Sequence, residues 1–265
     1  MDLGLEGRVA LVCASSGGFG KAAAVGFAQE GASVVLCARE PDRLKGAAAD
    51  VRAAARDGAR VSYRVADLSR REDITGLVDH ALAEFGRLDI LVTNAGGPPV
   101  AAFQDLGEDA WERGIDLTLR STIRCIRAVL PHMVKQGWGR IINITSVSAR
   151  QPINDLVISS TLRPGILGLA KVLANQYGRH GILINNVAPG YMLTDRQKEI
   201  SAARAAGRGI SSEEYVRELA REIPVQRYGD PAELASLIVF LGSERAGYIT
   251  GATIGVDGGL TKGLF

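Results

Sequence analysis

The stretch VALVCASSGGFG, residues 9–20, decides the fold of this chain. Its apolar first half is typical of a buried strand, and the residues that follow open directly into a helical pattern. Glycine in such a turn lets the backbone approach a pyrophosphate closely, and the helix N-terminus supplies free N–H groups. Gly18 and Gly20 stand where these needs arise. We therefore expect a dinucleotide site here, with a strand-to-helix turn that binds no ligand as the alternative.

Short apolar runs rich in Val and Ile alternate with helical segments along the whole chain. Runs that are apolar on both faces are typical of parallel strands covered by helices. The alternation predicts an α/β fold, a single-domain Rossmann-type doubly wound parallel sheet of about seven strands with helices on both faces, over residues 1–265. The expected strands are Val9–Ala14, Ser33–Ala38, Arg60–Ala66, Ile90–Thr93, Ile141–Thr145, Ile182–Val187 and Thr253–Val256. The expected helices are Phe19–Glu30, Pro41–Asp57, Arg71–Phe85, Asp109–Lys135, about Ser160–His180 and Pro231–Ser243.

A polar stretch without a strand, about residues 191–227, breaks this alternation. It holds two expected short helices, Arg196–Ala206 and Ser212–Ile223. Because ligands bind beyond the carboxyl ends of the strands in such sheets, an insertion that follows a strand is well placed to cover a substrate. We interpret this stretch as a substrate flap. A surface excursion with no role is the alternative.

The bulk composition is that of an ordinary globular protein, with 46% hydrophobic and 23% charged residues. A net charge of +2 without an arginine-rich block does not indicate a nucleic-acid partner. The chain has neither a signal-peptide pattern nor a run of 18 apolar residues, so no membrane association is expected. Cys13, Cys37 and Cys125 form no metal or redox motif, which favours buried reduced thiols, a cytoplasmic location and no metal.

The chain resembles the short-chain dehydrogenase/reductase family over nearly its whole length. The family's glycine turn, Thr-Gly-x-x-x-Gly-hydrophobic-Gly, maps onto Cys13–Gly20, where Ala14 replaces the first glycine. An alanine can be accommodated there if its φ stays negative. Further matches in the family's order are Asp67-Leu68, Asn94-Ala95-Gly96, Pro189-Gly190 followed by Thr194, and Asp257-Gly258-Gly259.

The resemblance implies a bound nicotinamide dinucleotide. An acidic residue at the end of the second strand would bind the ribose 2′-OH and repel a 2′-phosphate, but Arg39 stands there. A guanidinium is a suitable partner for phosphate, so NADP(H) is favoured and NAD(H) stays possible. The family's other basic residue, just before the second glycine, is replaced by Gly17. The expected cofactor-binding residues are Ser15, Ser16, Gly18, Phe19, Gly20, Arg39, Asp67, Leu68, Asn94, Ala95, Gly96, Arg163, Pro189, Gly190 and Thr194.

The resemblance also locates four catalytic positions, which the family fills with Asn, Ser, Tyr and Lys. Here Thr118, Ser146, Ser159 and Arg163 occupy them, so only the serine is retained. A phenol beside an ammonium can exchange a proton near neutral pH, whereas a serine hydroxyl is far less acidic and Arg stays protonated. Standard carbonyl reduction should therefore be slow. Arg163 could still bind a ribose or an oxyanion.

Two other side chains and one proline bear on this chemistry. Tyr191 is a candidate substitute acid, with a packed loop aromatic as the alternative, and Asp155 is another, with a helix cap as the alternative. Pro164 would remove one N–H from a helix interior. We therefore expect the helix either to begin near Ser160–Arg163 or to kink there.

Three functions are compatible with these residues. The first is divergent NADP(H)-dependent hydride transfer between cofactor and a small-molecule carbonyl or alcohol, as in the β-ketoacyl-carrier-protein-reductase-like branch. The second is a dinucleotide-binding protein with little or no redox activity, and the third is a non-redox isomerase or lyase on the same scaffold. The resemblance further implies a homo-oligomer, in particular a tetramer, in which the two long helices of one subunit pair with those of another. Ile166, Leu169, Val172 and Leu173 could serve this contact or face the sheet.

Overall fold

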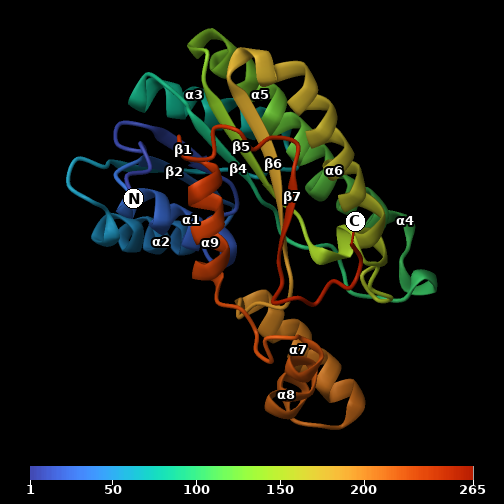
Figure 1. The fold of residues 1–265 in the computed structure, drawn as a ribbon. Coiled ribbons are helices and arrows are strands. Elements are labelled where there is room, and N and C mark those ends of the chain that lie inside the picture. Colours follow the sequence, from blue (N-terminus) through green and yellow to red (C-terminus); the bar gives the residue numbers. More distant parts are fainter. Residues whose placement is uncertain (265) are drawn as a thin grey trace.

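The computed structural model describes residues 1–264, and its centre is a parallel sheet of seven strands (Figure 1). The strand order is β3-β2-β1-β4-β5-β6-β7. Because the chain reverses its direction of travel across the sheet at β1, a crevice opens beyond the carboxyl ends of β1 and β4. The predicted doubly wound sheet is confirmed. The strands are β1 (Val9–Val12), β2 (Ser33–Ala38), β3 (Val61–Val65), β4 (Ile90–Thr93), β5 (Gly139–Ile144), β6 (Ile182–Pro189) and β7 (Thr253–Val256).

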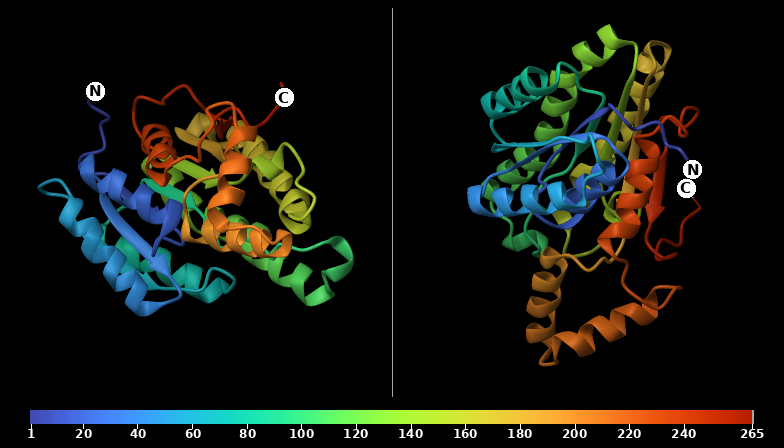
Figure 2. Two further views of the ribbon diagram at one scale, coloured as in Figure 1. Left: turned by 90° about the horizontal axis from the view of Figure 1, so that it is seen from below. Right: turned by 90° about the vertical axis from the view of Figure 1, so that its left-hand side faces the viewer.

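Helices cover both faces of the sheet (Figures 1 and 2). Successive side chains of a strand point to opposite faces, and β1 shows why all its residues are apolar. Ala10 and Val12 pack in one hydrophobic cluster, whereas Val9 and Leu11 pack in the other. The first cluster contains α1 (Gly18–Gln29), α2 (Pro41–Ala54) and α9 (Pro231–Leu241), and the second α3 (Arg71–Phe85), α5 (Ser121–Gln136) and α6 (Val157–Tyr177).

The expected long helix Asp109–Lys135 is interrupted by a wider turn. It consists of α4 (Glu108–Gly114), a π-helical segment η2 (Ile115–Arg120) and α5. Periodicity alone did not reveal this change, because a single π turn shifts the register by only one residue. The segment η2 contacts α6, and Gly114 leaves room there for the Ile158 side chain.

The start of α6 shows that the first alternative drawn from Pro164, a helix that begins near Ser160–Arg163, was wrong. The helix begins at Val157, ahead of Ser159, so Pro164 lies in the helix interior. Proline cannot donate to the carbonyl four residues back, at Ser160. The helix nevertheless persists, because Ile158 and its apolar neighbours are buried.

By length and apolar composition alone, the helical run Val157–His180 would be able to cross a membrane. In the fold this run is α6 followed by the short helix η4 (Gly178–His180), and α6 contacts β6. Ser159 and Arg163 lie in its first two turns. The same helix therefore covers the sheet and carries two of the candidate site residues.

The predicted flap forms two helices beyond the carboxyl edge of the sheet, α7 (Asp195–Arg208) and α8 (Ser212–Glu222) (Figures 1 and 2). Thr194 caps the first through its side chain, which accepts a hydrogen bond from the Gln197 N–H at 3.1 Å. Ser211 caps the second in the same way. These caps satisfy backbone donors that a helix start leaves free.

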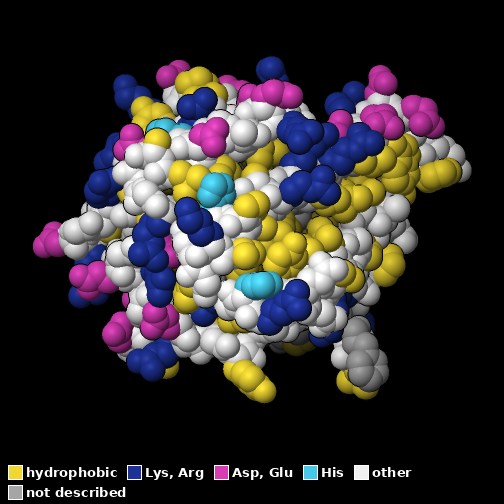
Figure 3. All heavy atoms as spheres, turned by 90° about the horizontal axis from the view of Figure 1, so that it is seen from above, with side chains coloured by type: hydrophobic (Ala, Val, Ile, Leu, Met, Phe, Trp, Pro, Cys, Tyr) yellow, Lys and Arg dark blue, Asp and Glu magenta, His cyan; other side chains and the backbone are white. Residues whose placement is uncertain are grey.

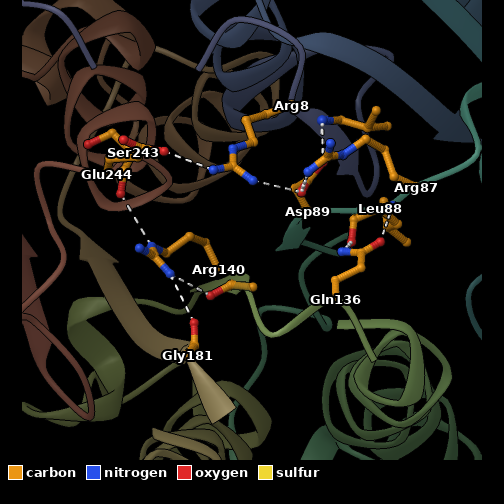
Figure 4. Close-up of polar contacts among 11 residues, drawn as sticks. Arg8, Arg87, Leu88, Asp89, Gln136, Arg140, Gly181, Ser243 and Glu244 are labelled. Carbon is orange, nitrogen blue, oxygen red and sulfur yellow. Dashed lines mark hydrogen bonds and ion pairs between the residues drawn. The ribbon is translucent and has the colours of Figure 1, made fainter. Parts of the chain in front are cut away.

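A buried carboxylate ties the strand starts together at the opposite edge of the sheet (Figure 4). Asp89 is fully buried and accepts two hydrogen bonds of 2.7 Å from Arg87, one from Arg8 and one from the Val9 N–H. Arg140 lies nearby, and burial together with the charge of Arg8 lowers its pKa to about 10. A paired carboxylate is tolerable in the core because its lone pairs are satisfied.

The surface at this opposite edge mixes Lys and Arg with Asp and Glu, with hydrophobic side chains between them (Figure 3). This mixture agrees with the small net charge of +2. Because both signs of charge occur on that face, it does not indicate electrostatic steering of a strongly charged macromolecule.

Candidate functional site

A cleft of about 490 Å³ lies at the carboxyl edge of the sheet, below α7. Loops that follow β1, β4, β5 and β6 line it together with α7 and the start of α6. The structure thus brings together segments that are far apart in the sequence. The predicted site residues that line the cleft are Ser16, Gly18, Phe19, Arg39, Asn94, Ala95, Gly96, Ser146, Ser159, Arg163, Pro189, Gly190 and Thr194.

The remaining predicted cofactor residues, Ser15, Gly20, Asp67 and Leu68, are not among the residues that line the cleft. Ser15 is buried, donates to the Val12 carbonyl oxygen at 2.9 Å and accepts from the Cys37 N–H at 3.0 Å. It therefore fixes the glycine turn to β2. Asp67 accepts hydrogen bonds from Ser69, and these with the charge of Arg39 hold the pKa of Asp67 below its ordinary value although burial opposes ionisation. Leu68 is buried in the core.

The glycine turn is too tight for a side chain at Gly20. A Cβ at Gly20 would lie 2.5 Å from the Ala14 carbonyl oxygen, closer than a real Cβ contact allows. The condition for an unstrained alanine, a negative φ, is not met, because Ala14 has φ +47°. The turn keeps the left-handed geometry that a glycine would adopt freely, so the alanine carries backbone strain. Asn94 donates to the same Ala14 oxygen at 3.4 Å.

A second arginine, Arg43, which the sequence analysis missed, lines the same cleft as Arg39. Arg43 belongs to the first turn of α2, and its Nη2 lies 3.5 Å from where a Cβ of Gly17 would be. Both guanidinium groups line the cleft and are exposed. Arg43 also pairs with Asp195 of the flap at 3.7 Å. The available signal was a second basic residue only four positions after Arg39, in the first turn of the helix that follows.

A ladder of buried side-chain hydrogen bonds crosses four strands just below the cleft. Thr93 donates to Asn143 at 2.7 Å, Asn143 donates to Asn186 at 3.0 Å, and Asn186 donates to Thr253 at 3.0 Å. Each amide uses its oxygen and one N–H, so the ladder has one direction. It fixes the positions of β4, β5, β6 and β7 along the strand axis relative to one another. It thereby also fixes the positions of the residues that follow these strands.

Hydroxyl groups and one arginine converge at the inner end of the cleft. Arg163 Nε donates to Ser159 Oγ at 3.0 Å, and its Nη1 donates to the Thr145 carbonyl oxygen at 2.7 Å. Ser148 Oγ lies 2.9 Å from Ser159 Oγ, and the Ser148 N–H donates to Ser146 Oγ at 3.1 Å. Burial lowers the pKa of Arg163 to about 10, so the group stays cationic at neutral pH. The arrangement offers hydroxyl protons next to a fixed positive charge.

Two predicted catalytic residues lie elsewhere. Thr118 is buried in η2, and its Oγ1 has no hydrogen-bond partner within residues 1–264. Tyr191 stacks on Tyr228, with ring centroids 5.6 Å apart and an interplanar angle of 20°. Burial raises the pKa of Tyr191, which makes it a weaker acid. This packing corresponds to the alternative of a packed loop aromatic.

Asp155 anchors the flap instead of capping α6. The residue at the helix start is Leu156, while the Asp155 carboxylate accepts hydrogen bonds of 2.8 and 2.6 Å from Arg204 of α7. Such a bidentate pair holds its two groups in one orientation. Arg196 of α7 reaches the Pro98 carbonyl oxygen at 3.2 Å on the other side of the cleft. The flap therefore contacts both walls of the cleft.

Metal chemistry has no support among residues 1–264, which contain no group of three or more His, Cys, Asp or Glu side chains able to hold an ion. Cys13, Cys37 and Cys125 are buried and free, as expected.

Comparison with known proteins shows similarity over nearly the whole chain. Residues 13–261 match the family described as enoyl-(acyl carrier protein) reductase. The chain is 35% identical over 259 residues to a short chain dehydrogenase/reductase of Aspergillus oryzae, covering 97% of this chain and 96% of that protein. It is 32% identical to the 3-oxoacyl-(acyl-carrier-protein) reductase of Thermotoga maritima, covering 97% and 98%.

Solved structures are similar too. The L-sorbose reductase from Gluconobacter frateurii, complexed with NADPH and L-sorbose, superposes with a TM-score of 0.94 at 34% identity, covering 100% of both chains.

Proposed function

Because the chain belongs to the short-chain dehydrogenase/reductase family, we propose that it is an NADP(H)-dependent oxidoreductase that interconverts a carbonyl and an alcohol. The observation that carries this proposal is that Ser146, Ser159 and Arg163 line the same cleft as Arg39 and Arg43. Polar groups for a carbonyl and cations for a phosphate thus share one cavity.

The residues of the cleft fit a bound dinucleotide. The turn packs Gly20 so closely against the Ala14 carbonyl that no Cβ fits there, and α1 begins at Gly18 with no side-chain cap on its first N–H groups. Arg39 and Arg43 are suited to a 2′-phosphate, because guanidinium groups bind phosphate through paired N–H donors. The cofactor, when bound, supplies or accepts the hydride. The protein must position the substrate and stabilise the charge on its oxygen.

Ser146 and Ser159 are the groups that contact the substrate oxygen in this proposal. Ser146 Oγ already accepts the Ser148 N–H, so its own proton is free to be donated into the cleft. Arg163 places a cation behind Ser159 and stabilises the negative charge that develops on the substrate oxygen during reduction. That oxygen then takes its proton from cleft water, since neither a serine nor an arginine is acidic enough at neutral pH.

The test uses purified protein, NADPH and a panel of ketones and β-ketoesters, with the absorbance of the reduced nicotinamide as the signal. We expect slow but measurable oxidation of NADPH. Ser159→Ala should lower kcat by about 100- to 1,000-fold, which corresponds to the loss of one donor to an oxyanion. Thr161→Ala is the matched control, because Thr161 is exposed and bonds only the Val157 carbonyl among residues 1–264. Equal activity of wild type and Ser159→Ala would remove Ser159 from the mechanism.

We further propose that the chain works as a homo-oligomer, in particular as a tetramer. The support is an apolar groove between α5 and α6, about 400 Å³ in volume, to which Leu169 and Leu173 contribute. Ile166 faces the core instead, and Val172 is 53% exposed. An exposed apolar helix face of this kind is suited to a symmetric contact. The buried free thiols agree with a reducing compartment, and we propose the cytoplasm.

A further inference from the structure

Ser148 is buried and contacts both serines of the cleft, Ser159 through its hydroxyl group and Ser146 through its backbone N–H. It lies in the short helix η3 (Val147–Ala149), is 1% exposed, and is set back from the cleft wall. Its Oγ lies 2.9 Å from Ser159 Oγ, and that oxygen is its side-chain partner within residues 1–264. Ser159 lines the cleft. One hydrogen bond joins the two hydroxyl groups, and each group carries one proton.

Burial determines which hydroxyl donates. If Ser159 donated to Ser148, the Ser148 proton would be sealed in the interior without an acceptor, and an unpaired buried donor is costly. If Ser148 donates to Ser159, its proton is satisfied, and the Ser159 proton is free to point toward the cleft. The second arrangement leaves no buried donor unpaired.

Arg163 reinforces this direction. A guanidinium can only donate, and Arg163 Nε donates to Ser159 Oγ at 3.0 Å. The Arg163 side chain is held in place by the carbonyl oxygens of Ile144 and Thr145. A hydroxyl oxygen has two lone pairs, and with donors at Ser148 and Arg163 both are used. Only the Ser159 proton is left for a ligand.

We propose that Ser148 is a positioning residue that, together with Arg163, makes Ser159 a one-way hydrogen-bond donor to the ligand in the cleft. The ligand atom at Ser159 must then be an acceptor, such as a carbonyl oxygen or the oxyanion formed by its reduction. Donation from two sides also polarises the Ser159 O–H, because linked hydrogen bonds strengthen one another. The inference rests on the proposed function for the identity of that acceptor, but not for the direction of the two protons.

A double-mutant cycle tests the role in turnover. Ser148→Ala should lower kcat about 10-fold, the size expected for one hydrogen bond, with KM and the Kd for NADPH unchanged. Because Ser148 acts through Ser159, the variant with both Ser148→Ala and Ser159→Ala should be no slower than Ser159→Ala alone. Ser148→Thr, which keeps the hydroxyl, should recover activity. The positioning role would be overturned if the double variant lost activity by the product of the two single losses. It would also be overturned if Ser148→Ala raised the Kd for NADPH as much as it lowered kcat.

Neutron diffraction from crystals exchanged into heavy water tests the proton direction without any substrate. We expect the Ser148 deuterium to point at Ser159 Oγ and the Ser159 deuterium to point into the cleft. A deuterium on Ser159 that points at Ser148 overturns the inference, whether or not the protein turns over. Absence of turnover with every carbonyl would instead count against the proposed function, and the neutron map would still decide the hydroxyl order.

Discussion

Replacement of Arg39 by alanine should weaken NADPH binding and leave NADH binding nearly unchanged. Arg39 follows β2 directly and lines the cleft, as does Arg43. NADPH differs from NADH by the 2′-phosphate, so a residue that binds this group affects only one of the two cofactors. Arg39→Asp should go further and reverse the preference, because a carboxylate repels the phosphate and accepts from a free 2′-OH.

The size of the effect follows from exposure. A hydrogen bond to a charged group contributes roughly 1.5–3 kcal/mol when it is well shielded. Arg39 is exposed, so the lower end applies, and about 1.4 kcal/mol corresponds to a tenfold change in Kd. Arg43 now pairs with Asp195 at 3.7 Å, and both side chains are largely exposed, so it can exchange that partner for phosphate at little cost. Loss of both arginines should therefore cost about 100-fold.

Fluorescence titration of each variant with NADPH and NADH measures both constants. Lys45→Ala is the matched control, since Lys45 is an exposed cation of the same helix α2 outside the cleft lining. The NADPH constant of wild type and of Arg43→Ala should also rise with salt, as charge screening requires. A wild type that prefers NADH, or an Arg39→Ala variant in which both constants change equally, would refute the assignment.

Three further predictions concern stability and assembly. Ala14→Gly should raise the free energy of unfolding by about 0.5–1 kcal/mol in denaturant titrations, because glycine relieves the strain of φ +47°; no gain would mean that the alanine turn is relaxed. The Arg227–Glu233 pair, with contacts of 2.7 and 2.8 Å, holds the pKa of Glu233 at about 2 against an ordinary 4.5. A depressed carboxyl pKa stabilises the fold above pH 4.5, so the stability gap between wild type and Glu233→Gln should close as the pH falls toward 2, and a pH-independent gap would contradict this. Leu173→Glu in the α5–α6 groove should yield a 28.0 kDa monomer in light scattering, whereas an unchanged oligomer would place the contact elsewhere.

Much of the cleft could be predicted because its residues belong to local motifs. Gly18 and Gly20 follow a buried strand directly, and the spacing from Ser146 to Ser159 is readable along the chain. Side-chain partners that come from distant elements could not be read in this way. Arg204 lies 49 residues from Asp155, and no sequence period connects them. The alternative of a helix cap at Asp155 was wrong, because its carboxylate instead pairs with Arg204 of α7.

Backbone conformations that oppose the local preference of a residue could also not be predicted from the sequence. Ala14 adopts a conformation that alanine disfavours, and Pro164 lies inside a helix. Packing against the sheet imposes both, because the energy gained by burying apolar neighbours exceeds the cost of one strained residue or one lost hydrogen bond. The π turn at Thr118 has the same origin, since η2 must fit against α6.

By itself, the sequence determined the alternation of buried strands and amphipathic helices, and with it the doubly wound sheet and the edge at which the cleft forms. Through the family resemblance it also predicted which chemical groups stand at the catalytic positions. Only the tertiary structure decided how those groups are used: that Arg43 joins Arg39, and that Ser148 lies behind Ser159. The reason is physical, because hydrophobic periodicity reports burial along one element, whereas hydrogen-bond direction depends on which side chains from other elements reach the same point.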